Sequence, residues 1–204
     1  MSGALLFIEV GGWSPAMVIL DSIEKMAGIQ VRQVELNDQP GVCLELTGSL
    51  AGADAARDSA HEIGDRMGVK IVVSVIAAPE PTGIRAIEIA PDFNPLLEQT
   101  TVVLPAKEES MAQQPGFAIG LIETQGFTAV FEALDTALKS ASVEVLAREK
   151  LGGGYITVVI KGDVAAVQAA VEAAKGRVEG LGRLIAAHVI PSPSQGVLSI
   201  LPKL

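Results

Sequence analysis

The sequence predicts an α+β protein made of two copies of one small domain, and two observations lead to that prediction. Shifting the chain along itself by 114 positions places Ile8 and Glu9 on Ile122 and Glu123 without a gap. Within each copy, β-branched runs alternate with segments of helical periodicity in the order strand, helix, strand, strand, helix, strand. This order is typical of ferredoxin-like domains, in which helices cover one face of an antiparallel sheet.

The repeat matches the first third of the 204-residue chain with its last third. Such a unit is much longer than a solenoid repeat and has the size of a small domain. We therefore expect a first, degenerate domain over residues 1–79, an ordered proline-rich connection over 80–115 and a second domain over 116–204, both in the same unpermuted order. Further matched pairs are Lys25 and Lys139, Glu35 and Glu149, Gly48 and Gly162, and Pro79 and Pro193.

In the second copy each element has its own signal. Alanine and leucine recur at i, i+3 and i+4 after Gly126, which predicts an amphipathic helix. The glycines at 152–154 separate two β-branched runs, which predicts a hairpin with a glycine-rich turn. The expected elements are a strand over 116–123, a helix over 127–141, strands over 143–149 and 155–161, a helix over 164–178 and a strand over 184–190.

The first copy repeats this order, and the connection after it has a different character. Six prolines lie between positions 79 and 115, and the segment is too long for an ordinary loop. We expect an ordered excursion over the surface, with short strands at the apolar pieces 84–89 and 101–104. The elements expected in the first copy are a strand over 5–10, a helix over 14–27, strands over 29–36 and 42–47, a helix over 51–67 and a strand over 69–76.

The composition excludes several classes of partner. Net charge is −9 and only 3% of the residues are aromatic, which argues against binding nucleic acid through cations or base stacking. No apolar run approaches the roughly 18 to 20 residues of a membrane span. Apolar residues nevertheless make up 49% of the chain and charged residues only 19%, so we expect the surplus apolar surface to be covered by self-association.

The sequence contains no recognisable catalytic or metal-binding motif. The glycines at 152–154 lead into a strand, whereas a phosphate-binding loop leads into a helix. Cys43 is expected to be a small buried side chain, and neither histidine recurs or lies near it, so no metal site is predicted. Glu9 and Glu123 are expected to make structural polar contacts. The sequence therefore predicts a protein that is not an enzyme.

The second copy resembles a bacterial microcompartment shell domain. The segments that carry the resemblance are AIGLIETQG at 118–126, ALDTALKSA at 133–141, EKLGGG at 149–154, KGDVAAV at 161–167 and HVIPSP at 188–193. The degenerate first copy is similar to that of the tandem-domain members. In those, three chains form a pseudohexameric tile with a central pore, and tiles pack edge to edge into a shell around enzymes.

The resemblance also implies site residues, partners and a location. The expected partners are further copies of the chain, other shell proteins and small metabolites that cross the pore, in a shell within the cytoplasm. Some tandem members hold an iron–sulfur cluster through a cysteine where this chain has Gln39, so no cofactor is expected. Edge arginines of the family are replaced by Ala78 and Ser192. The implied pore residues are Asn37, Asp38, Gln39, Leu151, Gly152 and Gly153, and the implied tile-edge residues are Lys25 and Lys139.

Two alternatives remain open from the sequence. One is a small-molecule-binding regulatory protein with paired ferredoxin-like domains, which would need an effector or DNA-binding segment. The other is an enzyme on the same duplicated fold, which would need titratable groups converging in a cleft. Neither feature is recognisable in the sequence.

Overall fold

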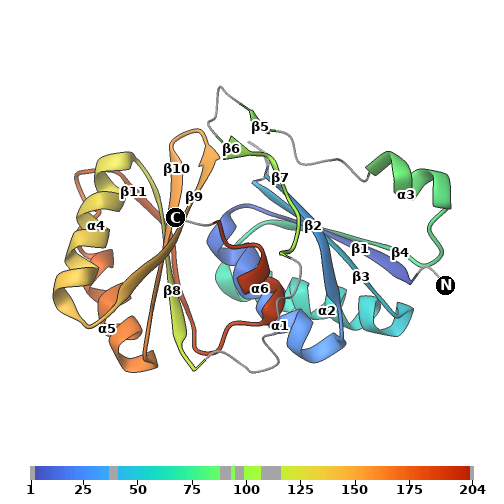
Figure 1. Ribbon diagram of the computed structural model, residues 1–204, viewed down its shortest axis with the longest axis horizontal. Helices are drawn as coiled ribbons and strands as arrows, with labels where there is room; N and C mark the ends of the chain where they lie inside the picture. The colour runs from blue at the N-terminus through green and yellow to red at the C-terminus, as the bar shows by residue number, and fades with distance from the viewer. Residues whose placement is uncertain (1–2, 37–40, 88–92, 95–98, 107–115, 203–204) are drawn as a thin grey trace.

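The computed structural model describes residues 3–36, 41–87, 93–94, 99–106 and 116–202. These residues form two α+β halves, and each half consists of an antiparallel sheet with helices packed on it (Figure 1). The expected fold class is thereby confirmed. The Asn37, Asp38 and Gln39 loop lies outside the described residues.

The first half is built on a sheet with the strand order β4-β1-β3-β2-β7. Its helices α1 and α2 pack on the face that carries Leu6 and Ile8. Ser49 caps α2 by accepting a hydrogen bond from the Gly52 amide at 3.0 Å. The elements are β1 Ala4–Val10, α1 Trp13–Ala27, β2 Gln30–Leu36, β3 Val42–Gly48, α2 Leu50–Met67 and β4 Ile71–Ile76.

The second half has the corresponding strand order, β11-β8-β10-β9. The register is also the same, because Ile8 pairs with Leu44 in the first half and Ile122 pairs with Val158 in the second. Asp163 caps α5 at the place where Ser49 caps α2. The elements are β8 Ala118–Gln125, α4 Phe127–Ser140, β9 Glu144–Gly152, β10 Tyr155–Gly162, α5 Val164–Lys175 and β11 Arg183–Ile190.

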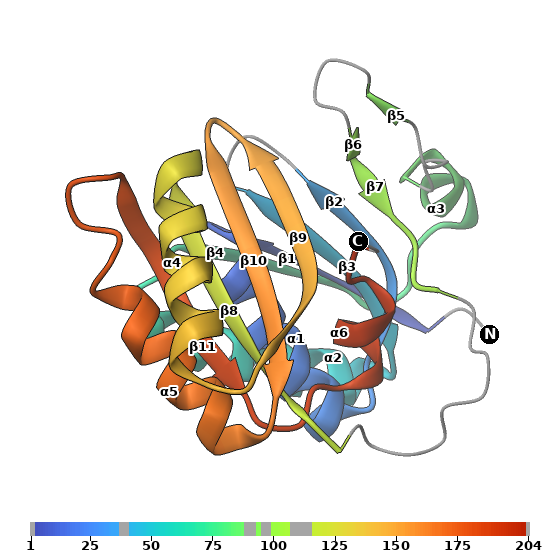
Figure 2. The same ribbon diagram turned by 60° about the vertical axis from the view of Figure 1, so that its left-hand side comes forward.

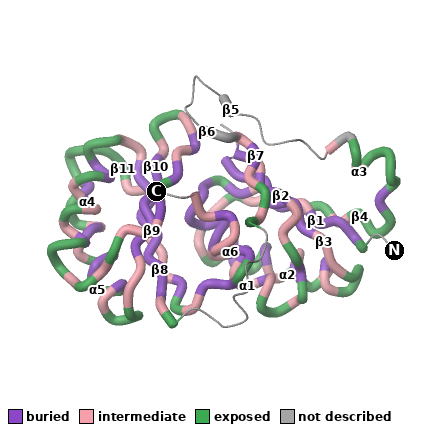
Figure 3. Tube along the Cα trace, viewed as in Figure 1, coloured by how far each residue is buried: buried purple, intermediate pink, exposed green. Residues whose placement is uncertain are grey.

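The two halves stack as alternating layers of helix and sheet. Helices α4 and α5 cover one face of the second sheet, and α1 packs against its other face at β8 and β11 (Figure 2). Because α1 also packs on its own sheet, one hydrophobic core includes residues of both halves, such as Leu20 and Ile119. In Figure 3 the buried residues lie mainly along the central strands of the two sheets, whereas the edge strand β4 is intermediate or exposed.

The connection differs from expectation in one place. Residues 84–87 belong to the helix α3 Pro81–Ile87 and not to the expected strand over 84–89. Glu80 explains the difference, because its carboxylate accepts hydrogen bonds from the amides of Thr82 at 2.7 Å and Gly83 at 3.1 Å. Pro81 follows this cap at the first helical position, where a missing N–H has no cost.

The remaining short elements complete the connection and the end of the second half. Strand β7 Val102–Val103 pairs with β2, which confirms a strand within 101–104. Strands β5 Phe93–Asn94 and β6 Gln99–Thr100 pair with each other. Helix α6 Gln195–Ser199, which the sequence did not predict, follows β11 and packs beside α1. Among the described residues, no helix is long and apolar enough to cross a membrane.

Candidate functional site

The most developed interaction surface within the described residues is the contact between the two halves. Helix α1 enters it with a fully buried stripe that includes Trp13, Met17 and Leu20. Opposite lie Ile119 and Leu121 of β8 and Ile190 of β11, which belong to the same core. A first-half helix is therefore held against the second-half sheet by a continuous apolar interface.

A buried carboxylate fixes the N-terminus of α1. Glu123 of β8 accepts hydrogen bonds from the backbone amides of Trp13 at 3.2 Å and Ser14 at 3.0 Å. These amides have no partner within the helix, and the helix dipole favours a negative charge there. Burial raises the pKa of Glu123 above its usual range, and the two amide hydrogen bonds oppose this rise. The expectation of a structural polar contact is confirmed for Glu123.

The close approach of Glu123 explains a glycine at the start of α1. Gly12 has a φ of +156° and precedes the helix without offering a side-chain cap. A Cβ at this position would lie 3.1 Å from Glu123 Oε2. Glycine therefore leaves room for the carboxylate that takes the place of a local N-cap.

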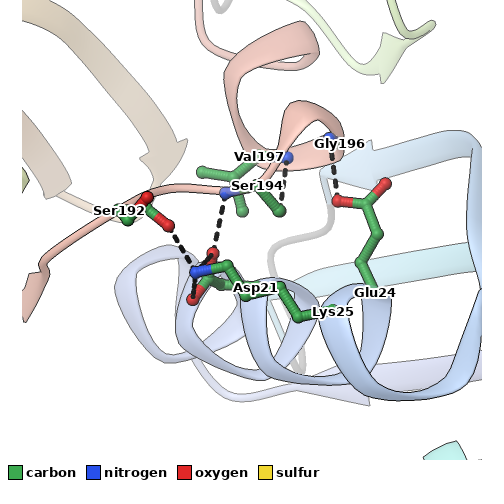
Figure 4. Close-up of polar contacts among 7 residues, drawn as sticks. All are labelled: Asp21, Glu24, Lys25, Ser192, Ser194, Gly196 and Val197. Carbon is green, nitrogen blue, oxygen red and sulfur yellow. Dashed lines mark hydrogen bonds and ion pairs between the residues drawn. The ribbon is translucent and has the colours of Figure 1, made fainter. Parts of the chain in front are cut away.

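Polar groups along α1 bind the segment that leads into α6 (Figure 4). Asp21 accepts a hydrogen bond from the Ser194 amide at 2.7 Å, and Glu24 accepts one from the Gly196 amide at 2.8 Å. Lys25 pairs with Asp21 at 2.8 Å and donates to the carbonyl of Ser192. The three hydrogen bonds to Ser192, Ser194 and Gly196 each join residues more than 165 positions apart, and the sequence did not identify these second-half partners.

The two predicted edge lysines therefore have different surroundings. Lys25 lies at the rim of the contact between the halves, with part of its side chain exposed. Lys139 pairs with Asp135 at 2.6 Å, and both side chains are exposed on α4. The matching Asp and Lys positions in the two copies thus support a contact in one half and face solvent in the other.

The predicted second-half pore residues lie at the tip of a hairpin. Strands β9 and β10 are joined through Gly152, Gly153 and Gly154, all with positive φ values, as expected for a tight glycine turn. Gln125 donates to the Gly153 carbonyl at 3.2 Å, which ties the tip to the end of β8. Leu151 is buried in the shared core, so of these residues the glycines present the exposed surface.

Several carboxylates lie on the sheet faces that point away from each half's own helices. Burial raises the pKa of Glu149 to about 7. Burial, together with the negative charge of Glu35, raises the pKa of Glu45 to about 7 as well. Gln33 donates to Glu45 at 3.0 Å and to Glu35 at 3.1 Å. The hydrogen-bond partners of these carboxylates are the Lys150 backbone amide and the Gln33 side-chain amide, and the three carboxylates form no catalytic arrangement.

Cys43 and the histidines do not form a metal site in the part of the chain that the structure describes. Cys43 is buried, as expected, and burial is the main cause that raises the pKa of its thiol to about 12. Burial lowers the pKa of His188, and the charge of Lys175 adds to this effect. No group of three or more potential metal ligands is found among the described residues.

Comparison with known proteins identifies relatives of the second half. Residues 118–193 match the model of the BMC domain family. The shell protein PduA of the Salmonella typhimurium microcompartment is 46% identical over 86 residues, covering 42% of this chain and 92% of that protein. The major carboxysome shell protein CsoS1A of Halothiobacillus neapolitanus is 44% identical over 94 residues, covering 46% of this chain and 96% of that protein.

One solved structure matches over nearly the whole chain. It is a microcompartment protein from Desulfitobacterium hafniense, and the match covers 97% of this chain and 99% of that one. Its sequence identity is 21% and its TM-score 0.38. At that score the match carries no weight for the arrangement of the two halves.

Proposed function

The chain belongs to the bacterial microcompartment shell proteins, and we propose that it is a tandem tile of such a shell: a homotrimer whose six halves form a pseudohexamer around a central pore. The observation that carries this proposal is the duplication of one shell domain within the chain. Residues 118–193 match the BMC domain model, and the matches to PduA and CsoS1A cover 92% and 96% of those shell proteins but less than half of this chain. Its first half has the same strand order and register.

The geometry of the contact between the halves supports a closed assembly. A helix of one half packs on the sheet of the other, so the two halves use different surfaces in the contact. Repetition of such a head-to-tail contact yields either a closed ring or an open filament. We propose that three chains close the ring, which gives each half an equivalent place around the axis.

The pore and the tile edges follow from this arrangement as parts of the proposal. The loop of Asn37, Asp38 and Gln39 alternates around the axis with the hairpin tip of Leu151, Gly152 and Gly153. Small metabolites cross there, and rings of polar groups at such a constriction set its permeability electrostatically. Lys25 and Lys139 contribute to the edges at which tiles meet one another or other shell proteins. The protein then has a structural role, without catalysis or cofactor, in a shell within the cytoplasm.

The oligomeric state tests the proposal directly. Multi-angle light scattering at micromolar concentration is expected to give a mass of about 63 kDa, three times the 21.1 kDa of one chain. Electron microscopy of concentrated protein is expected to show flat sheets of tiles. A monomer or a dimer would contradict the proposed tile.

A further inference from the structure

We propose that Gln33, Glu35 and Glu45 form a proton-controlled latch that holds the C-terminal end of helix α3 on the outer face of the first sheet. The outer face is the one turned away from α1 and α2, and α3 lies on that side of the sheet in Figure 1. All the contacts of the latch lie within one chain. The inference therefore goes beyond the proposed tile and does not depend on its trimer.

The centre of the latch is the side-chain amide of Gln33. Its Nε2 donates to Glu35 Oε1 at 3.1 Å, to Glu45 Oε1 at 3.0 Å and to the backbone carbonyl of Ile87 at 3.0 Å. Ile87 is the last residue of α3, where backbone carbonyls have no acceptor role within the helix. Gln33 is 3% and Glu45 4% exposed, and polar groups at such burial need hydrogen-bond partners. One buried amide group therefore connects two strands of the sheet with the end of α3.

The second half has apolar side chains where the first half has the two buried members of this cluster. Positions 33 and 45 correspond to Ala147 and Val159, which are fully buried in the shared core. Helix α3 itself corresponds to α6, which begins 114 positions later. The segment at the start of α6 is held through its backbone amides by carboxylates of α1. The two equivalent helices are thus fixed by different chemistry, and only α3 is fixed through a buried amide and carboxyl groups.

A proton on Glu45 stabilises the closed latch. Burial, together with the negative charge of Glu35, raises the pKa of Glu45 to about 7, and the effect of Glu35 exceeds the opposing effect of Arg32. A hydrogen bond between the carboxyl groups of Glu45 and Glu35 adds to the rise, and such a bond needs a proton between them. Once that proton is lost, two carboxylates and the negative end of the α3 dipole surround the amide of Gln33. Deprotonation of Glu45 therefore favours the release of α3.

The other ionisable groups near Glu45 do not offset this repulsion. Cys43 lies on the same face of β3, where burial first and then the charges of Glu45 and its neighbours raise the pKa of the thiol to about 12. Glu9 of β1 pairs with Cys43 across the sheet and adds a further negative charge. The charged side chain of α3 is Arg85, which is exposed. Strands β4 and β7 contain no charged residue.

Release of α3 can be measured because so short a helix does not persist by itself. It has seven residues, whereas isolated helices shorter than about 12 to 15 residues are marginal in water. Hydrogen exchange of the amides at 84–87, followed by mass spectrometry, therefore reports on the latch. The protection factor, which is the intrinsic exchange rate divided by the observed rate, removes the direct effect of pH on the exchange reaction.

In the wild-type protein, the protection factor of α3 is expected to fall about thirtyfold between pH 5.5 and pH 8.5. This value follows from a pKa of Glu45 of about 7 with α3 in place and the ordinary value of 4.5 after its release. The raised pKa belongs to the closed latch, so the latch is stable at low pH and weakens as the pH rises through 7. The amides of α6 serve as the control within the same molecule and are expected to keep their protection factor.

Two substitutions act on the latch itself. Glu45→Gln is neutral at every pH and can still accept from Gln33 and donate to Glu35, so α3 is expected to stay protected at both pH values. Gln33→Leu removes the donor to the carbonyl of Ile87, so α3 is expected to be weakly protected at both.

Glu80→Ala is the matched control at the other end of α3. Hydrogen bonds from the backbone amides of Gly83 and Thr82 lower the pKa of Glu80, so this cap stays charged between pH 5.5 and pH 8.5. Its loss is expected to lower the protection of α3 about fivefold at both pH values and to leave the pH dependence unchanged.

Three results would overturn the inference, all measured at one protein concentration. The first is a wild-type protection factor of α3 that is equal at pH 5.5 and pH 8.5. The second is a pH dependence in Glu45→Gln as large as that of the wild type, and the third is wild-type protection in Gln33→Leu. A monomer or a dimer in light scattering would contradict the proposed trimer and leave the latch unaffected, so the two proposals fail separately.

Discussion

Replacing Glu149 with glutamine is expected to remove a pH-dependent loss of stability. The Glu149 side chain lies on β9 between Ala147 and Leu151, both in the core shared by the two halves. Its carboxylate accepts a hydrogen bond from the Lys150 amide at 2.9 Å, yet burial still raises its pKa to about 7. Glutamine has the same shape, remains neutral and keeps an oxygen to accept this hydrogen bond.

The magnitude follows from the difference between the folded and unfolded pKa values. The folded value is about 7 and the ordinary value is 4.5. A raised pKa means that the folded state binds the proton more tightly, so the stabilisation is fully present below pH 4.5 and is lost as the pH rises through 7. At about 1.36 kcal/mol per pKa unit, the loss is on the order of 3 kcal/mol.

Urea unfolding between pH 4.5 and 8.5 measures this effect, at one fixed chain concentration because association adds to apparent stability. The free energy of unfolding of Glu149→Gln minus that of the wild type is expected to rise by about 3 kcal/mol across this range. Glu144→Gln is the control, because Glu144 lies on the same strand with an exposed side chain paired with Lys161 at 3.2 Å. A difference that does not change with pH would refute the reasoning.

Two further predictions concern the tile edge and the pore. Lys139→Asp is expected to leave the proposed trimer intact and to abolish sheets, because the exposed pair with Asp135 contributes under about 1 kcal/mol to folding while the reversed charge would lie at the proposed tile edge. Lys175→Asp on α5 is the control. Unchanged sheets in electron micrographs would make Lys139 an ordinary solvated charge. Asp38→Asn is expected to increase the passage of anions through reconstituted shells, because the three carboxylates of the proposed pore ring would no longer repel them. Equal selectivity in both proteins would exclude a carboxylate ring from the pore.

The sequence predicts the elements of the fold well because their signals are local and are given twice. Helical periodicity after Gly126 and the glycines at 152–154 each determine an element within a few residues of chain. The strand expected over 84–89 was wrong because a helix cap at Glu80 and Pro81 outweighed a short apolar run. Capping depends on a single side chain, and its signal is weaker than that of a periodic segment.

The contact between the halves could be predicted only in part. Asp21 and Lys25 recur as Asp135 and Lys139, which indicates a shared role, but the sequence does not show that Ser192 and Ser194 are the partners. Equivalent positions in the two copies also differ in burial, as Trp13 at 1% and Phe127 at 54% exposure do, and no local sequence pattern predicts this difference. A chain with two like domains has one contact inside it and two unpaired ends, so one copy of each surface is covered and the other is exposed.

Duplication has a consequence for how the proposed ring forms. Six separate domains need six contacts between chains, whereas three tandem chains need three, because the contact of α1 with β8 and β11 is already within each chain. Covalent linkage makes the contact between the two halves of one chain intramolecular, so this contact does not depend on the protein concentration. Half of the contacts in the proposed ring are then present within single chains at any protein concentration, and only the other half depends on association. Trp13 and Met17, which are buried in the contact within the chain, are therefore constrained by the folding of a single chain and not by association.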